Sequence, residues 1–302
     1  MMITVFTATY NRADTLPRLY DSLLQQISKD FEWLIVDDGS TDNTEYLVKE
    51  WIDEGKISVT YFKQENGGKH RAINKGVDLA NGVLFFIVDS DDYLPMNSLM
   101  LVENYYSQIK NNDEFIGVVG FNAYPDGELM GQNMFPEAIT DSNLIERREK
   151  FGVKADMAKV LITEKFRSFK FPDIIGEKFV AESLVWNRMA IQYKFRYFNE
   201  VIYIAEYMEG GLSNNSIRNR RKNPKYTTLL YQELSKNPMA PLKLRFRALI
   251  NFWRFALCKS SNIFELLKEV HFSMLAVIAL PLGVVLSFKD RFMQDVNIKK
   301  IK

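Results

Sequence analysis

The 302-residue sequence predicts an α/β fold, with a largely parallel central sheet, helices on both faces and a helical C-terminal tail. Short apolar runs alternate with helical patterns over the first 120 residues, and polar turn residues follow the runs. From about residue 240, basic and aromatic residues lead into an uncharged stretch. Because 47% of residues are hydrophobic and 25% are charged, the composition is that of a folded globular chain.

Five apolar runs in the first 120 residues are short enough to be buried strands. They are residues 3–6, 31–36, 57–62, 83–88 and 116–119. Apolar residues at helical spacing lie between them, in three groups: Leu16, Leu19, Leu23 and Leu24; Tyr46, Leu47, Trp51 and Ile52; and Ile73, Val77 and Ala80. Alternating strands and helices imply βαβ units, in which ligands bind at the carboxyl ends of the strands.

The second apolar run ends in a recognisable helix start. Gly39 predicts a turn, residues 40–42 are typical of an N-cap, and Glu45 is placed to complete a capping box. Asp37 and Asp38 therefore lie at the carboxyl end of a strand. Both carboxylates are candidate ligand-binding groups on that ground alone.

Charge is distributed unevenly along the chain. Residues 1–120 are acidic overall, whereas residues 215–260 carry eleven Lys and Arg and the single acid Glu233. The acidic half could hold a cation, and the basic segment could meet phosphates, anionic lipid or nucleic acid; a solvated basic face is the alternative. The adjoining apolar run favours lipid, so we expect no nucleic-acid partner.

Cysteine and histidine are too rare for two common kinds of site. The single Cys258 excludes an intramolecular disulfide, so nothing requires an oxidising compartment. His70 and His271 are the only histidines, which argues against a zinc site. The N-terminus has no signal-peptide pattern, so we expect a cytoplasmic protein.

The tail predicts membrane association. Residues 242–255 have the pattern of a basic amphipathic helix, and residues 272–288 are uncharged. At 1.5 Å per residue the uncharged stretch would reach about 26 Å, short of the roughly 30 Å hydrocarbon core, and Pro281 and Gly283 interrupt it. A surface or re-entrant segment is therefore favoured over a span and over a soluble helical tail or oligomer contact. We expect residues 240–290 to associate peripherally with the inner face of the cell membrane.

An acidic loop, Asp89-Ser90-Asp91-Asp92, directly follows the fourth apolar run. Close carboxylates repel one another by about 1 kcal/mol per pair in water and by more in a low dielectric. A hard divalent cation such as Mg²⁺ or Mn²⁺ would relieve that repulsion. The alternative is an acidic turn that caps a following helix beginning near Pro95 and Asn97.

Four motifs that occur in order make residues 1–215 resemble family 2 glycosyltransferases of the GT-A fold. The motifs are Thr7-Ala8-Thr9-Tyr10-Asn11-Arg12, Val36-Asp37-Asp38-Gly39-Ser40-Thr41-Asp42, Asn66-Gly67-Gly68-Lys69-His70-Arg71-Ala72-Ile73-Asn74-Lys75-Gly76 and the acidic loop. Any one motif could arise by chance, whereas four in register are specific.

The resemblance implies roles for individual residues. It assigns nucleotide binding to Thr7, Tyr10, Asp38, Lys69, Arg71, Asp89 and Ser90, and it assigns the Mn²⁺ or Mg²⁺ ligand to Asp91. Core packing is the alternative for the first two, and a solvated basic face is the alternative for Lys69. Asp37 is expected to cap its turn and Asp92 to cap a helix.

The resemblance also implies a catalytic base. The family places an acid ahead of a later helix, and Glu182 matches it, although the second acid of the usual pair is Ser183 here. Glu177 and Asp173 remain alternative bases. Residues 209–216 resemble a loop that closes over the donor, or are an ordinary linker.

The predicted organisation is a GT-A catalytic domain over residues 1–215 and a basic, apolar helical tail over residues 216–302. Within the domain, residues 1–120 would bind the nucleotide sugar and residues 121–215 the acceptor. The implied activity is inverting transfer from a nucleotide diphosphate sugar, with a UDP-sugar favoured, to a saccharide or lipid-linked saccharide in cell-surface polysaccharide or lipopolysaccharide synthesis. The alternatives are a degenerate nucleotide-sugar-binding membrane module and a nucleotidyltransferase, which would need a glycine-rich loop after the first strand.

Overall fold

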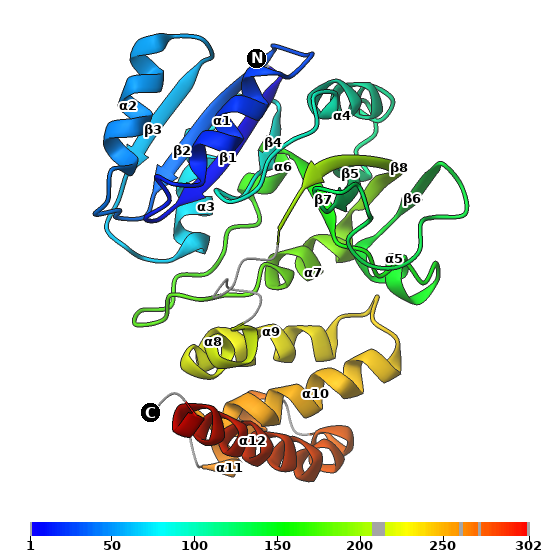
Figure 1. The fold of residues 1–302 in the computed structure, drawn as a ribbon. Coiled ribbons are helices and arrows are strands. Elements are labelled where there is room, and N and C mark those ends of the chain that lie inside the picture. Colours follow the sequence, from blue (N-terminus) through cyan, green and yellow to red (C-terminus); the bar gives the residue numbers. More distant parts are fainter. Residues whose placement is uncertain (1, 207–214, 260–261, 271–272, 301–302) are drawn as a thin grey trace. The chain divides into compact units, whose positions relative to one another are not determined.

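The computed structural model describes residues 2–206, 215–259, 262–270 and 273–300 (Figure 1). The chain divides into two compact units. The first comprises Met1–Phe171 and Arg188–Tyr207, and the second comprises Pro172–Asn187 and Met208–Lys302. Residues 172–187, grouped above with the catalytic domain, thus pack with the tail.

The first unit is built on one eight-stranded sheet in the order β3-β2-β1-β4-β7-β5-β8-β6. Its strands are β1 (Ile3–Thr9), β2 (Phe31–Asp37), β3 (Val59–Lys63), β4 (Leu84–Ile87), β5 (Phe115–Ala123), β6 (Ile139–Ser142), β7 (Met157–Ile162) and β8 (Lys194–Ile204). Its helices are α1 (Leu16–Leu24), α2 (Thr44–Glu54), α3 (Lys69–Leu79), α4 (Ser98–Ser107), α5 (Leu144–Glu149) and α6 (Thr163–Arg167); α7 (Ser183–Gln192) has residues in both units.

The five predicted strands are all present, in a mixed sheet. Strands β1 to β4 pair with one another in parallel, in the order β3-β2-β1-β4, as predicted. The fifth predicted strand, β5, does not continue that series, because β7 lies between β4 and β5 and is antiparallel to both. Strand β8 pairs in parallel with β5, and β6 pairs antiparallel with β8.

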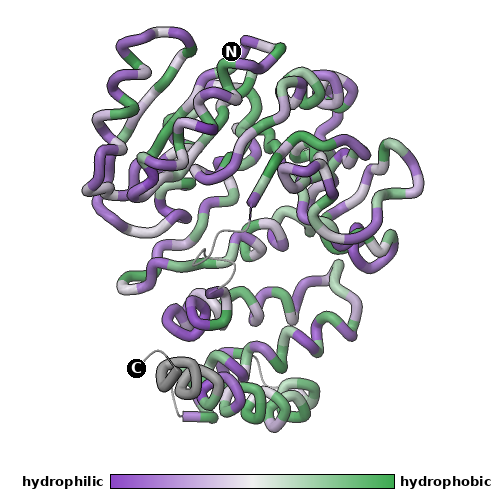
Figure 2. The backbone as a smooth tube through the Cα atoms, viewed as in Figure 1, coloured by the Kyte–Doolittle hydropathy of each residue, from purple (hydrophilic) through white to green (hydrophobic). Residues whose placement is uncertain are grey.

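Helices cover both faces of the sheet because side chains alternate along each strand. On one face Trp33 stacks with Trp51 of α2, in a cluster that also includes residues of α1 and α4. On the other face Phe6 stacks on Phe85, which meets Phe166 of α6. Gly76 of α3 leaves room for the Phe6 ring, since a Cβ there would lie 2.1 Å from it. This two-sided burial accounts for the apolar colouring of the central strands (Figure 2).

The second unit is helical. It contains α8 (Ser216–Lys222), α9 (Pro224–Lys236), α10 (Leu242–Ala256), α11 (Ile263–Glu269) and α12 (Met274–Lys300). Its core joins Leu249, Phe252 and Trp253 of α10 to Leu266 of α11 and to small residues of α12. An ion pair stabilises the packing of α10 on α12, because Arg254 of α10 donates two hydrogen bonds of 2.7 Å to the buried Asp290 of α12.

Two predictions for the tail are revised. Pro281 and Gly283 do not interrupt the helix, since α12 runs through both of them; Phe272 lies outside the described residues. The apolar face of the basic helix α10 is buried in the second unit's core. No helix in the described parts of the chain combines the length and hydropathy needed to cross a membrane.

Candidate active site

Apart from Thr7, which lies within β1, the predicted site residues of the first unit follow four adjacent parallel strands. Thr9 of β1 pairs with Asp37 of β2, Asp37 pairs with Lys63 of β3, and Phe6 of β1 pairs with Ile87 of β4. This register brings the loops after all four strands to one edge of the sheet. The motif residues at positions 10–12, 38–42, 66–71 and 89–92 lie in or beside those loops.

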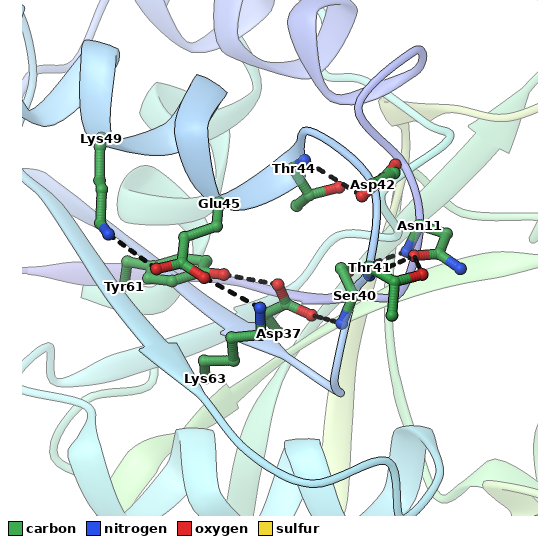
Figure 3. Close-up of polar contacts among 10 residues, drawn as sticks. All are labelled: Asn11, Asp37, Ser40, Thr41, Asp42, Thr44, Glu45, Lys49, Tyr61 and Lys63. Carbon is green, nitrogen blue, oxygen red and sulfur yellow. Dashed lines mark hydrogen bonds and ion pairs between the residues drawn. The ribbon is translucent and has the colours of Figure 1, made fainter.

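The loops after β1 and β2 are tied together by side chain to backbone hydrogen bonds (Figure 3). The Asn11 carboxamide accepts from the Thr41 N–H at 2.8 Å, and the Asn11 N–H donates to the Ser40 hydroxyl at 2.8 Å. Asn11 has a φ of 52°, a left-handed conformation that asparagine tolerates better than most residues. These contacts fix the loop that carries the half-exposed ring of Tyr10.

Asp37 caps its turn, as predicted. Its buried carboxylate accepts from the Ser40 N–H at 2.7 Å and from the Tyr61 hydroxyl at 2.5 Å (Figure 3). Burial and the bond to this carboxylate raise the pKa of Tyr61, so its hydroxyl remains a donor. Asp37 therefore serves the local fold.

The capping box predicted for α2 is wrong: the N-cap residue is Asn43, which lies outside the predicted residues 40–42 and has no side-chain capping bond, and Glu45 is not part of a cap. Glu45 makes ion pairs with Lys49 at 2.7 Å and Lys63 at 2.9 Å, and these bonds lower its pKa to about 2. The carboxylate of Asp42 instead accepts from the Thr44 N–H at 3.1 Å and from Ala13 at 3.1 Å. The Glu45 carboxylate is therefore bonded to two lysines and does not accept a backbone N–H at the helix start, because the ion pairs compete with capping.

Asp38 organises the glycine loop ahead of α3. Its buried carboxylate accepts from the Gly67 N–H at 2.8 Å and the Gly68 N–H at 2.7 Å, and Gln64 also donates to it at 2.8 Å. Gly68 has a φ of 100°, which disfavours any residue with a Cβ. The Arg71 guanidinium donates a hydrogen bond to the Gly67 carbonyl.

The acidic loop gathers three carboxylates. Asp89, Asp91 and Asp92 each offer an oxygen, and these oxygens all lie within 4.8 Å of one another. Two basic side chains lie beside them: Lys69, at the start of α3, pairs with Asp89 at 2.6 Å, and Arg12, after β1, approaches Asp91 at 3.7 Å. All-oxygen donors at this spacing suit a hard divalent cation, which prefers carboxylates and phosphates as ligands.

The distant strand β8 holds this loop in place. The hydroxyl of the buried Tyr203 donates to the Asp92 carboxylate at 2.7 Å and accepts from the Asp89 N–H at 2.9 Å. Next to it, Tyr93 and Ile204 exchange backbone hydrogen bonds of 3.1 and 2.9 Å. Asp92 thus caps no helix, contrary to the prediction, because its carboxylate is turned to β8. Burial and the Asp89 charge raise the pKa of Asp92 to about 7.

Arg18 of α1 also braces the acidic loop. It donates to the Asp91 carbonyl, pairs with Glu206 at 2.8 Å and lies over the Tyr93 ring at 4.9 Å. Arg18 and Tyr203 were not among the residues that the sequence indicated. Neither belongs to a motif, and both lie far from residues 89–92 in sequence.

The part of the chain that carries these loops matches a known protein family. Residues 4–163, more than half of the chain, match the family described as "Glycosyl transferase family 2". The chain belongs to glycosyltransferase family 2. The glycosyltransferase GlyG of Streptococcus pneumoniae serotype 4 is 24% identical over 223 residues, which cover 70% of this chain and 72% of GlyG. The poly(ribitol-phosphate) beta-N-acetylglucosaminyltransferase TarS of Staphylococcus aureus is 28% identical over 150 residues, which cover 49% of this chain and 26% of TarS.

Solved structures agree with a GT-A fold for this family 2 glycosyltransferase. TarS 1–349 of S. aureus in complex with UDP-GlcNAc gives a TM-score of 0.65 at 21% identity and covers 93% of this chain and 80% of that one. The mannosyltransferase PcManGT of Pyrobaculum calidifontis, in complex with GDP-Man and Mn²⁺, gives a TM-score of 0.55 at 17% identity and covers 95% and 87%. At these identities the likeness concerns the fold.

The remaining residues that the family resemblance named differ in exposure. Thr7 is fully buried, and its hydroxyl accepts from the Trp33 indole at 3.0 Å, so its side chain packs in the core. Ser90 is buried within the acidic loop, and Tyr10 is half-exposed. Lys69 is partly exposed beside Asp89.

The candidate bases lie in the second unit. Glu177 is buried, and its carboxylate accepts from the Lys225 and Tyr226 N–H groups at 2.8 Å, which caps the first turn of α9. Glu182 is partly exposed immediately before α7, where its carbonyl accepts from Val185 at 3.0 Å. Asp173 is exposed. Most of the predicted lid, residues 209–214, lies outside the described residues.

Proposed function

We propose that this family 2 enzyme transfers a sugar with inversion from a nucleotide diphosphate sugar to an acceptor hydroxyl, with Mn²⁺ or Mg²⁺ bound at the acidic loop. The observation that carries the proposal is the grouping of three carboxylate oxygens within 4.8 Å at the carboxyl end of β4. A UDP-sugar is favoured, because the TarS structure contains UDP-GlcNAc. The Mn²⁺ in the PcManGT complex supports a divalent cofactor.

Each residue of the sheet edge has a proposed task. Tyr10 offers a ring to the base, Asp38 contacts the nucleoside while it holds the glycine loop, and Asp89 and Ser90 contact the ribose. Lys69 and Arg71 approach the diphosphate at a helix start, where anions are favoured. Thr7, which has no exposed surface, would contribute through the core beneath the base.

The chemistry needs a base and charge compensation. Glu182 is proposed to take the proton from the acceptor hydroxyl. The acceptor oxygen then bonds to the anomeric carbon of the sugar, while the bond between that carbon and the diphosphate breaks. Asp91, with Asp89 or Asp92, would hold the cation, which when bound neutralises the leaving diphosphate. Glu177 is the weaker candidate base, because its carboxylate already caps α9.

The wider setting is also part of the proposal. We propose residues 1–215 as the catalytic part, with a donor half over 1–120 and an acceptor half over 121–215, and residues 216–302 as the tail. The acceptor would be a saccharide or a lipid-linked saccharide in cell-surface glycan synthesis. The protein would act in the cytoplasm at the inner face of the membrane, through residues 240–290.

Asp91→Asn tests the proposal. The substitution keeps the side-chain shape but removes the charge that a cation needs, so we expect donor hydrolysis to fall by about 100-fold or more, in line with the loss of transition-state charge stabilisation. Mn²⁺-dependent thermal stabilisation by the nucleotide sugar should also disappear. Asp113→Asn is the matched control, since Asp113 is fully exposed and pairs only loosely with Lys165, at 3.7 Å.

Two outcomes would contradict it. If Asp91→Asn binds Mn²⁺ and donor as the wild type does, the acidic loop is not the metal site. If the wild type is stabilised by nucleotide sugars but neither hydrolyses nor transfers any of them, the chain is a degenerate binding module.

A further inference from the structure

Helix α12 carries its large apolar side chains on the side that faces away from the second unit's core. The buried residues recur at steps of three or four and form one stripe of small or polar side chains: Ala276, Ala279, Gly283, Ser287 and Asp290. The residues of the opposite stripe are all between 49% and 79% exposed: Met274, Ile278, Leu282, Val285, Phe288 and Phe292. We call this second stripe the α12 outer face.

This arrangement reverses the usual amphipathic pattern, in which a surface helix turns its apolar side toward the core. The small stripe is explained by packing, because a Cβ at Gly283 would lie 2.3 Å from the Trp253 Cβ of α10. Packing inside the unit does not explain the large outer residues. Contiguous exposed apolar surface of this kind marks an interaction site.

The outer face differs from the rest of the apolar tail. Leu249, Phe252 and Trp253 of α10 are buried among the helices of the second unit, so they are not available to a partner. The apolar colouring that Figure 2 shows along the first part of α12, in contrast, belongs largely to exposed side chains. Leu242 of α10 and Phe264 of α11 are exposed as well, but α12 carries a continuous row of exposed apolar side chains, so the main apolar contact with a partner lies on α12.

Charge indicates which partner fits. The described residues between 215 and 292 include many exposed bases: Arg218, Lys222, Lys225, Lys236, Lys243, Arg247, Lys259, Lys268, Lys289 and Arg291. The acids among those residues are fewer: Glu265 is exposed, Glu233 and Glu269 are partly exposed, Glu269 pairs with Lys259, and Asp290 is buried in its own ion pair. A second copy of the chain would bring like charge against this surface, whereas an anionic lipid surface attracts it.

Two bases lie beside the apolar stripe itself. Lys289 follows Phe288 and is exposed, and the Arg291 guanidinium lies 5.9 Å from the Phe288 ring centre. Long basic side chains at the edge of an apolar helix face can reach phosphate headgroups while the apolar residues enter the acyl boundary.

We propose that α12 docks flat on an anionic bilayer, with its outer face in the acyl boundary and Lys289 and Arg291 at the headgroups. The helix does not span the bilayer, because its opposite stripe packs on α10. The proposal rests on the membrane setting proposed above and assigns that contact to residues of α12, but it depends on no step of sugar transfer.

The test is flotation of the full-length protein with vesicles of phosphatidylglycerol and phosphatidylcholine in equal parts. Val285→Glu with Phe288→Glu places two charges in the outer face, and we expect it to reduce vesicle-bound protein at least tenfold. The matched control, Tyr46→Glu with Ile52→Glu, changes two exposed apolar residues of α2 in the first unit and should float like the wild type. Binding of the wild type should weaken with salt and on pure phosphatidylcholine.

Three results would overturn the proposal. The first is equal flotation of the Val285/Phe288 variant and the wild type, and the second is a wild type that stays with the unbound fraction. The third is a wild-type dimer in sedimentation without lipid that this variant converts to a monomer, since the face would then bind a second copy. Thermal unfolding and donor hydrolysis should be unchanged in the variant, so failure of the docking proposal is distinct from failure of the proposed activity.

Discussion

At the scale of single residues, the hydroxyl of Tyr203 is the least expected part of the candidate site. It bonds to the Asp92 carboxylate and to the Asp89 N–H, and so it links the two ends of the acidic loop. Burial raises its pKa well above the ordinary value, which keeps the hydroxyl protonated and able to donate. A residue outside the motif thus fixes the spacing of the carboxylates on which cation binding is proposed to depend.

Tyr203→Phe should therefore affect both stability and metal binding. Removal of a buried hydroxyl leaves its partners unsatisfied, so the free energy of unfolding should fall by about 1–3 kcal/mol. The apparent Kd for Mn²⁺, measured by titration calorimetry on the folded protein, should rise about tenfold, in the range seen when groups supporting metal ligands are removed.

Tyr105→Phe is the control for that substitution. Tyr105 also hydrogen-bonds a carboxylate, Glu200, but it lies on α4 and stacks on Phe198. It should lose stability without weakening Mn²⁺ binding. An unchanged Mn²⁺ affinity in Tyr203→Phe would show that the loop keeps its geometry without β8.

At the scale of elements, the close crossing of α10 and α12 depends on Gly283. In an exposed helix, replacing glycine by alanine is expected to stabilise the helix by about 1 kcal/mol. Here the added Cβ would lie 2.3 Å from the Trp253 Cβ and 2.7 Å from the Ile250 carbonyl oxygen, so the helices must separate. We expect Gly283→Ala to lower the free energy of unfolding by about 1–3 kcal/mol, the usual cost of overpacking.

Urea unfolding of Gly283→Ala and Val285→Ala provides the measurement. Val285 is exposed on the same helix, and its substitution should change stability by less than about 0.5 kcal/mol. A stabilised Gly283→Ala variant would mean that helix propensity outweighs the crossing and that α10 and α12 are not in close contact.

The elements that the sequence predicted are those with a clear period. Strands β1 to β5 and helices α1 to α3 follow apolar runs and helical spacing, and the four loops after β1 to β4 carry the motifs. Strands β6 to β8 were not predicted, because β8 mixes charged and aromatic residues and β7 is a short run between loops. The contacts of Tyr203 could not be predicted either, since 111 residues separate it from Asp92.

At the scale of the whole molecule, the tail is more than an appendage. The segment 172–187, which carries Glu182, packs in the second unit with the C-terminal helices. The buried Tyr226 of α9 accepts from the Ile174 N–H at 2.8 Å and donates to the Pro172 carbonyl at 2.7 Å. The Asn223 side chain accepts from Lys178 at 2.8 Å. The segment that carries the proposed base is therefore held by helices that lie C-terminal to residues 4–163, the part of the chain that matches family 2.

Substitution of the two glutamates in this segment separates catalysis from support. Glu182→Gln removes the proposed base, so kcat for transfer should fall by about 10²–10⁴-fold while stability and donor binding persist. The Glu177 carboxylate caps α9 by accepting two backbone N–H bonds, and Glu177→Gln weakens that cap. The free energy of unfolding should therefore fall by about 1 kcal/mol, and kcat should change less than in Glu182→Gln. Transfer kinetics with thermal unfolding distinguish the two. If Glu177→Gln loses kcat at unchanged stability and Glu182→Gln does not, the base is Glu177 and the α9 cap must open during turnover.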